Sequence, residues 1–448
     1  MYLWGIICVL IRAHFSKIWE KILRRMENKS KTRFTKKFAI VGVILILVVF
    51  FSTLIFTGSL NEHSELDNHH FNQTENLKKD APVRESTGTD AETLNAPDSD
   101  STGTDAEARI VMVGDVLLHT PVSDSGLRED GSYNYEHLFS HVKSDIESAD
   151  LALVNQEVIL GGRELGLSGY PAFNGAYEVG DALVEAGFDV ILHATNHALD
   201  KGKTGVLNCL NYWRTSHPQI GVVGINDSSE MQQHIYVAEV KGIKIAILNY
   251  TYGTNGIAMP ADMPYAVNLL DREQIERDIS KAKEKADFII VCPHWGIEYT
   301  HEENSEQTSL AMFMAEKGAN LIIGAHPHVV QPVRWVEAAN GNRALVYYSL
   351  GNFINATSEY GSGVADRMIG AMADVTIIKS GQNGEVKIVN YQAVPLVTQM
   401  LTGSGRITTY KLSDYTPELA AQNEVIERDA AFSYDYCVNL FNEIFNYE

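Results

Sequence analysis

From residue 109 onward, short apolar segments recur along the chain, and each of them ends in polar residues. These segments lie at 109–115, 150–157, 189–197, 243–250, 287–296, 321–328 and 344–352. Runs of this length that are apolar almost throughout are typical of strands buried on both faces of a sheet. Helical patterns separate many of them, at 180–188, 271–286 and 309–319. Strands that alternate with helices predict an α/β fold with a largely parallel sheet.

Two later segments, 371–379 and 385–394, follow each other without a helical pattern between them. They predict antiparallel strands. The tail beyond about residue 413 predicts a helix, with an apolar face from Tyr434 to Phe445. We therefore predict one folded domain over residues 108–400 and a helical C-terminal extension over residues 401–448.

The N-terminal quarter of the chain has a different pattern. Residues 38–57 are a twenty-residue apolar run without a charge. At about 1.5 Å per residue, about 20 helical residues cross the ~30 Å apolar core of a bilayer. Residues 58–107 are rich in Ser, Thr, Asn, Asp and Glu and contain a direct repeat, at 81–92 and 96–107. We predict a transmembrane anchor at 38–57 and a disordered acidic linker at 58–107.

Charge is distributed very unevenly on the two sides of this anchor. Residues 1–37 carry ten Lys or Arg and two Glu, whereas the rest of the chain carries 26 Lys or Arg and 55 Asp or Glu. A basic flank predicts a cytoplasmic N-terminus, and thus a single-pass protein of the cell membrane with an extracytoplasmic C-terminal domain. A cleaved signal peptide is the alternative, but its apolar region is only about 7–15 residues long. The acidic body argues against nucleic-acid binding, which needs positive charge.

The polar residues at the predicted strand ends are of types that bind metals. Because the carboxyl ends of parallel strands meet at one edge of a sheet, we expect these residues to gather there. Residues two apart share one face of a strand, so we expect each pair with that spacing to point the same way. A single histidine beside a strand is usually a hydrogen-bonded core residue, but five such strand endings favour a metal site. The residues are Asp115, Asn155 and Glu157, Asn196 and His197, His294, and His326 and His328.

The mixture of carboxylate, amide and imidazole groups suits Mn²⁺, Fe or Zn²⁺ better than Ca²⁺ or Mg²⁺. There are enough ligands for two divalent transition metal ions. Two ions about 3.5–4 Å apart can stabilise both the attacking and the leaving oxygen of a displacement. The sequence therefore predicts a dinuclear centre of the hydrolase type.

Six short motifs surround these residues. They are GDVLLH (114–119), NQEV (155–158), ATNHALDKG (194–202), HWGIEY (294–299), GAHPHVVQP (324–332) and YSLGNF (348–353). These motifs resemble those of the CapA family of capsule and poly-γ-glutamate biosynthesis, within the calcineurin-like metallophosphoesterase superfamily. The resemblance implies a four-layer α/β/β/α sandwich with a dinuclear site at its mouth. It also implies a catalytic role for His197 and metal ligation by Asp115, Glu157, Asn196, His294, His326 and His328.

Two positions depart from the motifs of that superfamily. Its first motif is Asp-x-His, but residue 117 is Leu, and His119 is four residues after Asp115. The carboxylate of its second motif is normally Asp, whereas Glu157 carries one more methylene. Candidates for substrate binding near the motifs are Asn155, Arg163, Arg334 and Asn352, with Lys201 and Lys203 completing a basic rim.

Three functions fit these features. The first is a membrane-anchored, extracytoplasmic, hydrolase-like protein of capsule or poly-γ-glutamate synthesis and export, with a polyanionic surface polymer and other membrane subunits of a polymer synthase as partners. The second is a non-catalytic subunit of such a synthase or exporter. The third is a metal-dependent phosphatase or phosphodiesterase unrelated to capsule. The predicted anchor and linker favour the first two.

Overall fold

The computed structural model describes residues 104–403 and 406–445. The basic segment 1–37, the predicted anchor 38–57 and almost all of the linker 58–107 lie outside the described residues. Among the residues that are described, no helix is both long enough and apolar enough to cross a bilayer.

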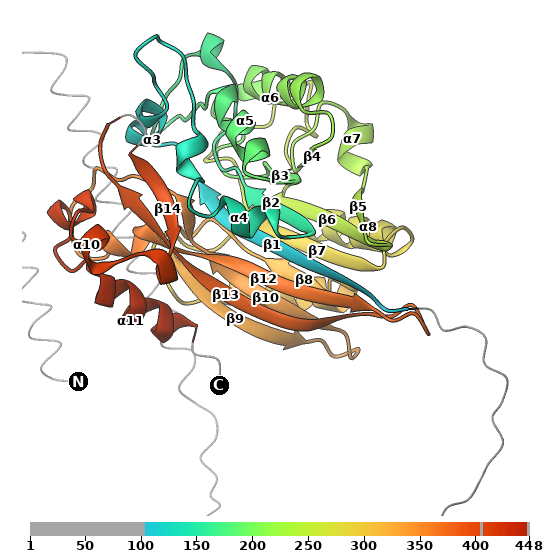
Figure 1. The fold of residues 1–448 in the computed structure, drawn as a ribbon. Helices are drawn as coiled ribbons and strands as arrows, with labels where there is room; N and C mark the ends of the chain where they lie inside the picture. Colours follow the sequence, from blue (N-terminus) through green and yellow to red (C-terminus); the bar gives the residue numbers. More distant parts are fainter. Residues whose placement is uncertain (1–103, 404–405, 446–448) are drawn as a thin grey trace, which may run out of the picture. The chain divides into compact units, whose positions relative to one another are not determined.

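Two mixed β-sheets form the centre of the described part (Figure 1). The eight-stranded sheet has the order β14-β13-β12-β1-β2-β3-β4, and β11 pairs with the end of β1. Its strands are β1 (Ala106–Val116), β2 (Leu151–Asn155), β3 (Val190–Leu192), β4 (Gly221–Val223), β11 (Asn352–Ile354), β12 (Ile369–Lys379), β13 (Val386–Met400) and β14 (Ile407–Lys411).

The six-stranded sheet has the order β5-β6-β7-β8-β10-β9. Its strands are β5 (Tyr236–Val240), β6 (Ile243–Thr251), β7 (Phe288–His294), β8 (Leu321–Ile323), β9 (Val330–Glu337) and β10 (Arg343–Leu350). The helices of the described part are α3 (Thr120–Ser125), α4 (Lys143–Glu147), α5 (Tyr177–Glu185), α6 (Gly202–Ser216), α7 (Ser229–Gln233), α8 (Arg272–Lys283), α9 (Ser305–Lys317), α10 (Pro417–Ala420) and α11 (Tyr434–Ile444).

Both sheets are mixed: the eight-stranded sheet has a parallel half that ends at β4 and an antiparallel half that ends at β14, whereas the six-stranded sheet has a parallel centre between antiparallel edge strands β5 and β9. Strands β1 to β4 are parallel, as are β6, β7, β8 and β10. The predicted antiparallel pair, 371–379 with 385–394, is confirmed as β12 and β13. Strands β4, β5, β9 and β14 were not predicted, and all four lie at sheet edges.

Alternate residues of the six-stranded sheet belong to two different cores, because successive side chains of a strand point to opposite faces. In β7, Ile290 and Cys292 face the eight-stranded sheet, and the sulfur of Cys292 lies 3.8 Å from that of Met112 in β1. Ile289 and Val291 instead pack in a second core that contains apolar residues of α8 and α9. Helices α4, α5 and α6 contribute to the first core (Figure 1). The described part is thus a mixed α/β fold with helices outside two facing sheets.

The segment 401–448 contains a strand as well as the predicted helix. β14 pairs with the end of β13, so the predicted boundary at residue 400 falls within one sheet. Helix α11 begins after Ser433, whose hydroxyl caps the N–H of Tyr436, and it buries Cys437 and Phe441 in the core. The C-terminal segment is therefore packed against the rest of the fold.

Candidate metal centre

Asp115 joins the two sheets at the centre of the site. It is the tenth residue of β1, and its Oδ1 accepts a hydrogen bond of 2.7 Å from Nδ2 of Asn155, at the end of β2. Its Oδ2 accepts a bond of 3.2 Å from the backbone N–H of His326. His294, the last residue of β7, has its Nδ1 3.4 Å from Nδ2 of Asn155. The predicted gathering of polar residues at the strand ends is therefore present, and all of these side chains are buried.

The pleat of a strand does not position Glu157, His326 and His328, contrary to our prediction. β2 ends at Asn155 and β8 ends at Ile323, so all three residues lie in the loops that follow. His326 and His328 have φ angles of +99° and +59°, in a region that non-glycine residues rarely occupy and that costs about 1–3 kcal/mol per residue. Their ring centroids are 5.8 Å apart. A left-handed backbone on both sides of Pro327 aims the two imidazoles at the site.

Gly114 allows two backbone segments to approach closely beside Asp115. A Cβ at this position would lie 1.9 Å from the carbonyl oxygen of Gly351. The same carbonyl accepts a 3.0 Å hydrogen bond from the N–H of Asp115. The position of the Asp115 carboxylate therefore depends on residue 114 being a glycine, which has no side chain.

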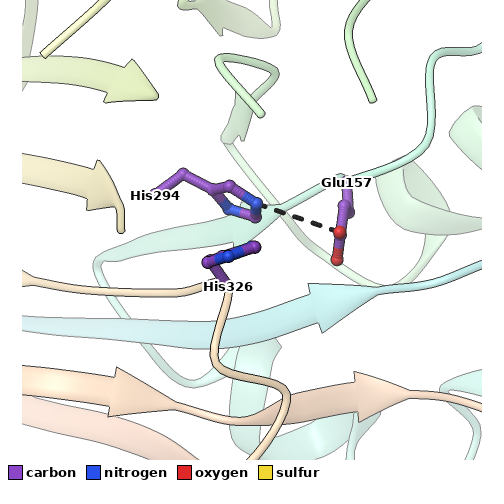
Figure 2. A group of neighbouring side chains, drawn as sticks. All are labelled: Glu157, His294 and His326. Carbon is purple, nitrogen blue, oxygen red and sulfur yellow. Dashed lines mark ion pairs between the residues drawn. The ribbon is translucent and has the colours of Figure 1, made fainter. Parts of the chain in front are cut away.

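Glu157 belongs to two groups of ligand atoms. One group joins it to His294 and His326, whose rings lie beside its carboxylate in Figure 2, and the other joins it to Asp115 and His328. The ligand atoms of each group lie within 4.8 Å of one another. Oε1 of Glu157 is 3.8 Å from Nε2 of His294 and 3.6 Å from Nε2 of His328. Glu157 thus stands where a carboxylate shared by two ions would stand.

Unpaired buried atoms show that these residues fit a metal. Both carboxylate oxygens of Glu157 and Nδ1 of His326 are buried and have no hydrogen-bond partner within residues 104–403 and 406–445. An isolated buried carboxylate is strongly destabilising, and proteins normally pair it or place it on a metal. Oδ1 of Asn196 lies 2.9 Å from Nε2 of His294 and adds an amide oxygen to the group that contains His294 and His326. This donor set suits Mn²⁺, Fe or Zn²⁺.

His197 forms a pair with Asp200 beside the cluster. Its Nδ1 lies 2.7 Å from Oδ2 of Asp200, and its ring packs edge-on against Phe173 at a centroid distance of 4.6 Å. Oδ2 of Asp200 also accepts a 2.7 Å bond from the N–H of Phe173. We did not predict Asp200 as a site residue, although it lies within the ATNHALDKG motif three residues after His197 and could have been found from that spacing.

A cavity of about 490 Å³ opens onto the cluster. His197 and His328 form part of its wall, together with Leu117, which occupies the position of the expected ligand histidine. His119 also lines the cavity, and burial, together with the charge of His328, lowers the pKa of His119 to about 4. Glu298 adds a further unpredicted carboxylate, which forms a third group of ligand atoms with His326 and His328.

The chain matches the family described as bacterial capsule synthesis protein PGA_cap over residues 109–357. This chain belongs to the PGA_cap family. It is 36% identical over 174 residues to the PGA biosynthesis protein CapA of Bacillus subtilis, covering 38% of this chain and 44% of that protein. It is 28% identical over 258 residues to the capsule biosynthesis protein CapA of Bacillus anthracis, covering 55% and 59%. The chain spans about half the length of the curated relatives that it matches.

Three solved structures of low identity are also similar to this PGA_cap chain, each with a TM-score below 0.5. A phosphatase from Mycoplasma pneumoniae is 15% identical, with a TM-score of 0.38 and coverage of 65% of this chain and 94% of that one. A 5′-nucleotidase precursor from Thermus thermophilus is 15% identical, with a TM-score of 0.41 and coverage of 65% and 54%. An NAD nucleotidase of Haemophilus influenzae is 15% identical, with a TM-score of 0.42 and coverage of 76% and 67%.

Burial and charge set the protonation of the ligands in the PGA_cap site. Burial raises the pKa of Glu157 well above its ordinary value and lowers the pKa of His294 and of His326 well below theirs. Burial also opposes the protonated form of His328, but the carboxylates of Glu157 and Asp115 outweigh it and raise the pKa of His328 to about 10. Without a metal, His328 and Glu157 therefore retain a proton between them at neutral pH.

Metal loading at pH 7 is expected to release about one proton per protein, because metal ligands bind in their deprotonated forms. The apparent affinity should rise with pH, since the pKa of about 10 at His328 lies above the working range. Calorimetric titration of Zn²⁺ into chelator-treated protein, in buffers with different heats of ionisation, measures the number of protons. The variant His301→Gln, outside the cluster and paired with Asp366, should leave that number unchanged. Metal binding without proton release would show that Glu157 and His328 do not hold a proton between them in the metal-free protein.

The structure does not bring the predicted basic rim to the cavity. Arg163 pairs with Glu178 at 3.1 Å and Arg334 pairs with Glu303 at 2.6 Å, and neither lines the cavity. Lys203 pairs with Asp262. Asn155 lies inside the cluster, as described above, rather than on the cavity wall.

Asn352 does line the cavity, and Arg367 lies there without having been predicted. Oδ1 of Asn352 is 3.0 Å from Nδ1 of His328. Arg367 falls beyond residue 357, where the PGA_cap match ends, and no motif in the sequence marked it. All six predicted metal ligands fall inside the matched segment.

Proposed function

We propose that this chain is a metal-dependent protein of capsule or poly-γ-glutamate synthesis, with a dinuclear centre of the hydrolase type. The observation that carries the proposal is the buried carboxylate of Glu157, which lies between two groups of ligand atoms and has no hydrogen-bond partner among the described residues. The similarity to the PGA biosynthesis protein of Bacillus subtilis and the capsule biosynthesis protein of Bacillus anthracis supports the biological role.

In the proposed reaction, Asp115, Glu157 and His328 hold one ion, and Glu157, Asn196, His294 and His326 hold the other. Two such ions supply Lewis acidity and make hydroxide available near neutral pH. The bond attacked is a phosphoester, or an amide or ester of the polymer.

His197 is the proton donor of this proposal. When its Nδ1–H donates to Asp200, Nε2 is the ring nitrogen left for the cavity that His197 lines. The carboxylate orients the imidazole, as a carboxylate does for a catalytic histidine. His197 then protonates the leaving group or stabilises its developing charge.

We also propose that residues 38–57 anchor the chain in the cell membrane, with the body on the extracytoplasmic side. The basic segment before this apolar run and the acidic chain after it support that orientation. In this arrangement the linker 58–107 separates the body from the bilayer, beside the polymer and the membrane subunits of its synthase.

The variant His197→Ala is expected to keep its metal and to lose hydrolytic activity by about 10²–10⁴-fold, which is the usual contribution of a general acid or base. The measurements are metal content of the full-length protein, hydrolysis of a phosphodiester and of γ-linked glutamate oligomers, and polymer output of cells. His217→Ala is the matched control, because His217 forms a similar pair with Asp181, at 2.7 Å, outside the cavity. A wild-type protein that is purified without metal, and that takes up none, would exclude every hydrolytic version.

A non-catalytic metal-binding subunit is the second candidate, and Leu117 favours it. This apolar side chain lines the cavity where a further ligand is expected, which leaves one group of ligands with fewer donors. Three results together would support this candidate: the wild type and His197→Ala both bind metal, neither of them hydrolyses the substrates, and cells that carry His197→Ala lose their polymer output.

A further inference from the structure

Arg367 is, within the described residues, the one lysine or arginine that lines the cavity. It lies in the 3-10 helix η3 (Ala365–Met368), and its guanidinium carbon is 3.7 Å from the ring centroid of Tyr299. The nitrogen Nη1 donates a 2.7 Å hydrogen bond to Oε2 of Glu359. The side chain of Arg367 is 13% exposed, whereas that of Glu359 is 62% exposed. A largely buried, stacked cation is thus paired with a largely solvated anion.

The backbone of Arg367 is tied to the metal cluster. Its carbonyl oxygen accepts a 3.0 Å hydrogen bond from Nδ2 of Asn352, whose Oδ1 contacts His328. Asn355, which also lines the cavity, is 1% exposed, and its Oδ1 has no hydrogen-bond partner among the described residues. Asn352 therefore fixes the backbone of Arg367 relative to His328, and the stacking on Tyr299 holds the guanidinium at the end of the side chain.

We propose that Arg367 forms a subsite for an anionic group of the substrate, a carboxylate or a phosphate, beside the metal centre. This inference rests on the proposed function where it calls the anion a part of the substrate. The binding of an anion by Arg367 does not depend on the proposed function. A guanidinium presents parallel N–H donors that match two oxygens of a carboxylate or phosphate, and stacking on Tyr299 holds its plane. Glu359 occupies this donor face when no substrate is bound.

The charge of the protein explains why such a subsite is needed. The chain after residue 37 carries 26 Lys or Arg against 55 Asp or Glu, so a polyanion is repelled over most of its surface. Glu298 and Glu359 also line the cavity. The Glu359 side of the pair is solvated, which weakens the ion pair, so an incoming anion that engages two donors of the guanidinium can displace Glu359.

The test measures direct binding of two probes, inorganic phosphate and glutarate, to the full-length protein by calorimetry. Glu359→Gln frees the guanidinium and is expected to tighten binding by about fivefold, because it removes a competitor worth about one weak ion pair. Arg367→Gln is expected to weaken binding by about tenfold or more, since it removes charge-assisted hydrogen bonds. The double variant should match Arg367→Gln, because Glu359 acts only through Arg367.

The opposite signs of the two single variants separate a binding role from a structural one. If Arg367 only holds the loop that carries Glu359, both variants weaken binding alike, and the subsite is excluded. Arg334 and Glu303 form a similar pair outside the cavity, so Arg334→Gln and Glu303→Gln should leave binding unchanged. If Arg367→Gln does not fold, Arg367→Lys replaces it and should still weaken binding, since lysine lacks the planar fork.

The arms of the experiment also separate the two anions and the two proposals. A larger effect of the variants on glutarate identifies a carboxylate, and a larger effect on phosphate identifies a phosphate. The titrations are repeated after chelator treatment. Because Arg367 is not a metal ligand, the effects of the variants should persist in the metal-free protein. If the protein takes up no metal, the proposed hydrolase is excluded. The subsite is still supported in that case if Glu359→Gln binds the anion more tightly than the wild type. Normal metal content without any response to Glu359→Gln and Arg367→Gln would exclude the subsite alone.

Discussion

The variant Glu157→Gln is expected to lose the metal ions of both groups of ligands. It is also expected to be more stable than the wild type when both proteins are metal-free. The carboxylate is the residue common to the two groups, so its neutral isostere weakens both. In metal-free protein neither oxygen of this buried carboxyl group has a hydrogen-bond partner among the described residues, and the attraction of His328, 3.6 Å away, does not outweigh the cost of burial, which still raises the pKa of Glu157. Replacing the ionised group by its neutral isostere should therefore raise the free energy of unfolding by about 1–3 kcal/mol.

The sign of the pH dependence follows from the raised pKa of Glu157. A carboxyl group with a raised pKa in the folded state contributes stability below its unfolded pKa, and that contribution is lost as pH rises through the folded value. Glutamine does not titrate. The stability advantage of Glu157→Gln in metal-free protein should therefore be smallest in acid and grow as the pH rises above 4.5.

Thermal unfolding with and without a chelator, together with metal analysis, checks these expectations. Wild-type protein should lose stability on chelation, whereas Glu157→Gln should not respond. Glu303→Gln is the matched control, because this carboxylate pairs with Arg334 outside the cavity and belongs to none of the groups of ligand atoms, so the variant should retain the metal. Full metal content in Glu157→Gln would show that the shared position does not hold the ions.

Gly114→Ala is expected to lower the free energy of unfolding by about 3 kcal/mol, near the upper end of what overpacking costs. The added Cβ would meet the carbonyl oxygen of Gly351 at 1.9 Å, and backbone cannot move aside as a flexible side chain can. Since Asp115 follows directly and bonds to the same carbonyl, metal content should fall as well.

Gly253→Ala provides the control for this substitution. An added Cβ there has no atom within 4 Å, and Gly253 is not among the residues with positive φ. Its stability should be unchanged or higher by about 0.4–1 kcal/mol, because alanine restricts the unfolded chain. Equal stabilities of the two alanine variants, measured by denaturant unfolding, would contradict the close approach at Gly114.

The central strands and the types of the candidate ligands could be predicted because short segments of the sequence are enough to recognise both. Fully buried strands such as β6 and β7 are continuous apolar runs, and the polar residues that follow them stand out. Strands β5 and β9 at the sheet edges were missed because half-exposed strands lack such runs. Helix α6 was missed because two glycines and several polar residues obscure its periodicity.

The loop geometry and the cavity wall could not be predicted, because distant contacts determine them. The N–H of Tyr299 donates to the carbonyl of Pro327 at 2.8 Å, and the N–H of His326 donates to Asp115. These bonds hold backbone conformations that the His-Pro-His sequence does not favour by itself. Arg367 likewise reaches the cavity only through Tyr299 and Asn352.

The place of β1 in its sheet has a consequence for the order of folding. β1 pairs on one side with β12, from Ala106 with Lys379 to Val113 with Met372, although the family match ends at residue 357. Contacts between such distant segments form slowly, and the open edge of β1 stays exposed until they do. We therefore expect Asp115 to reach its place only after β12 has been synthesised. A nascent chain should then capture its metal late, and a fragment that ends at residue 357 should aggregate instead of binding metal.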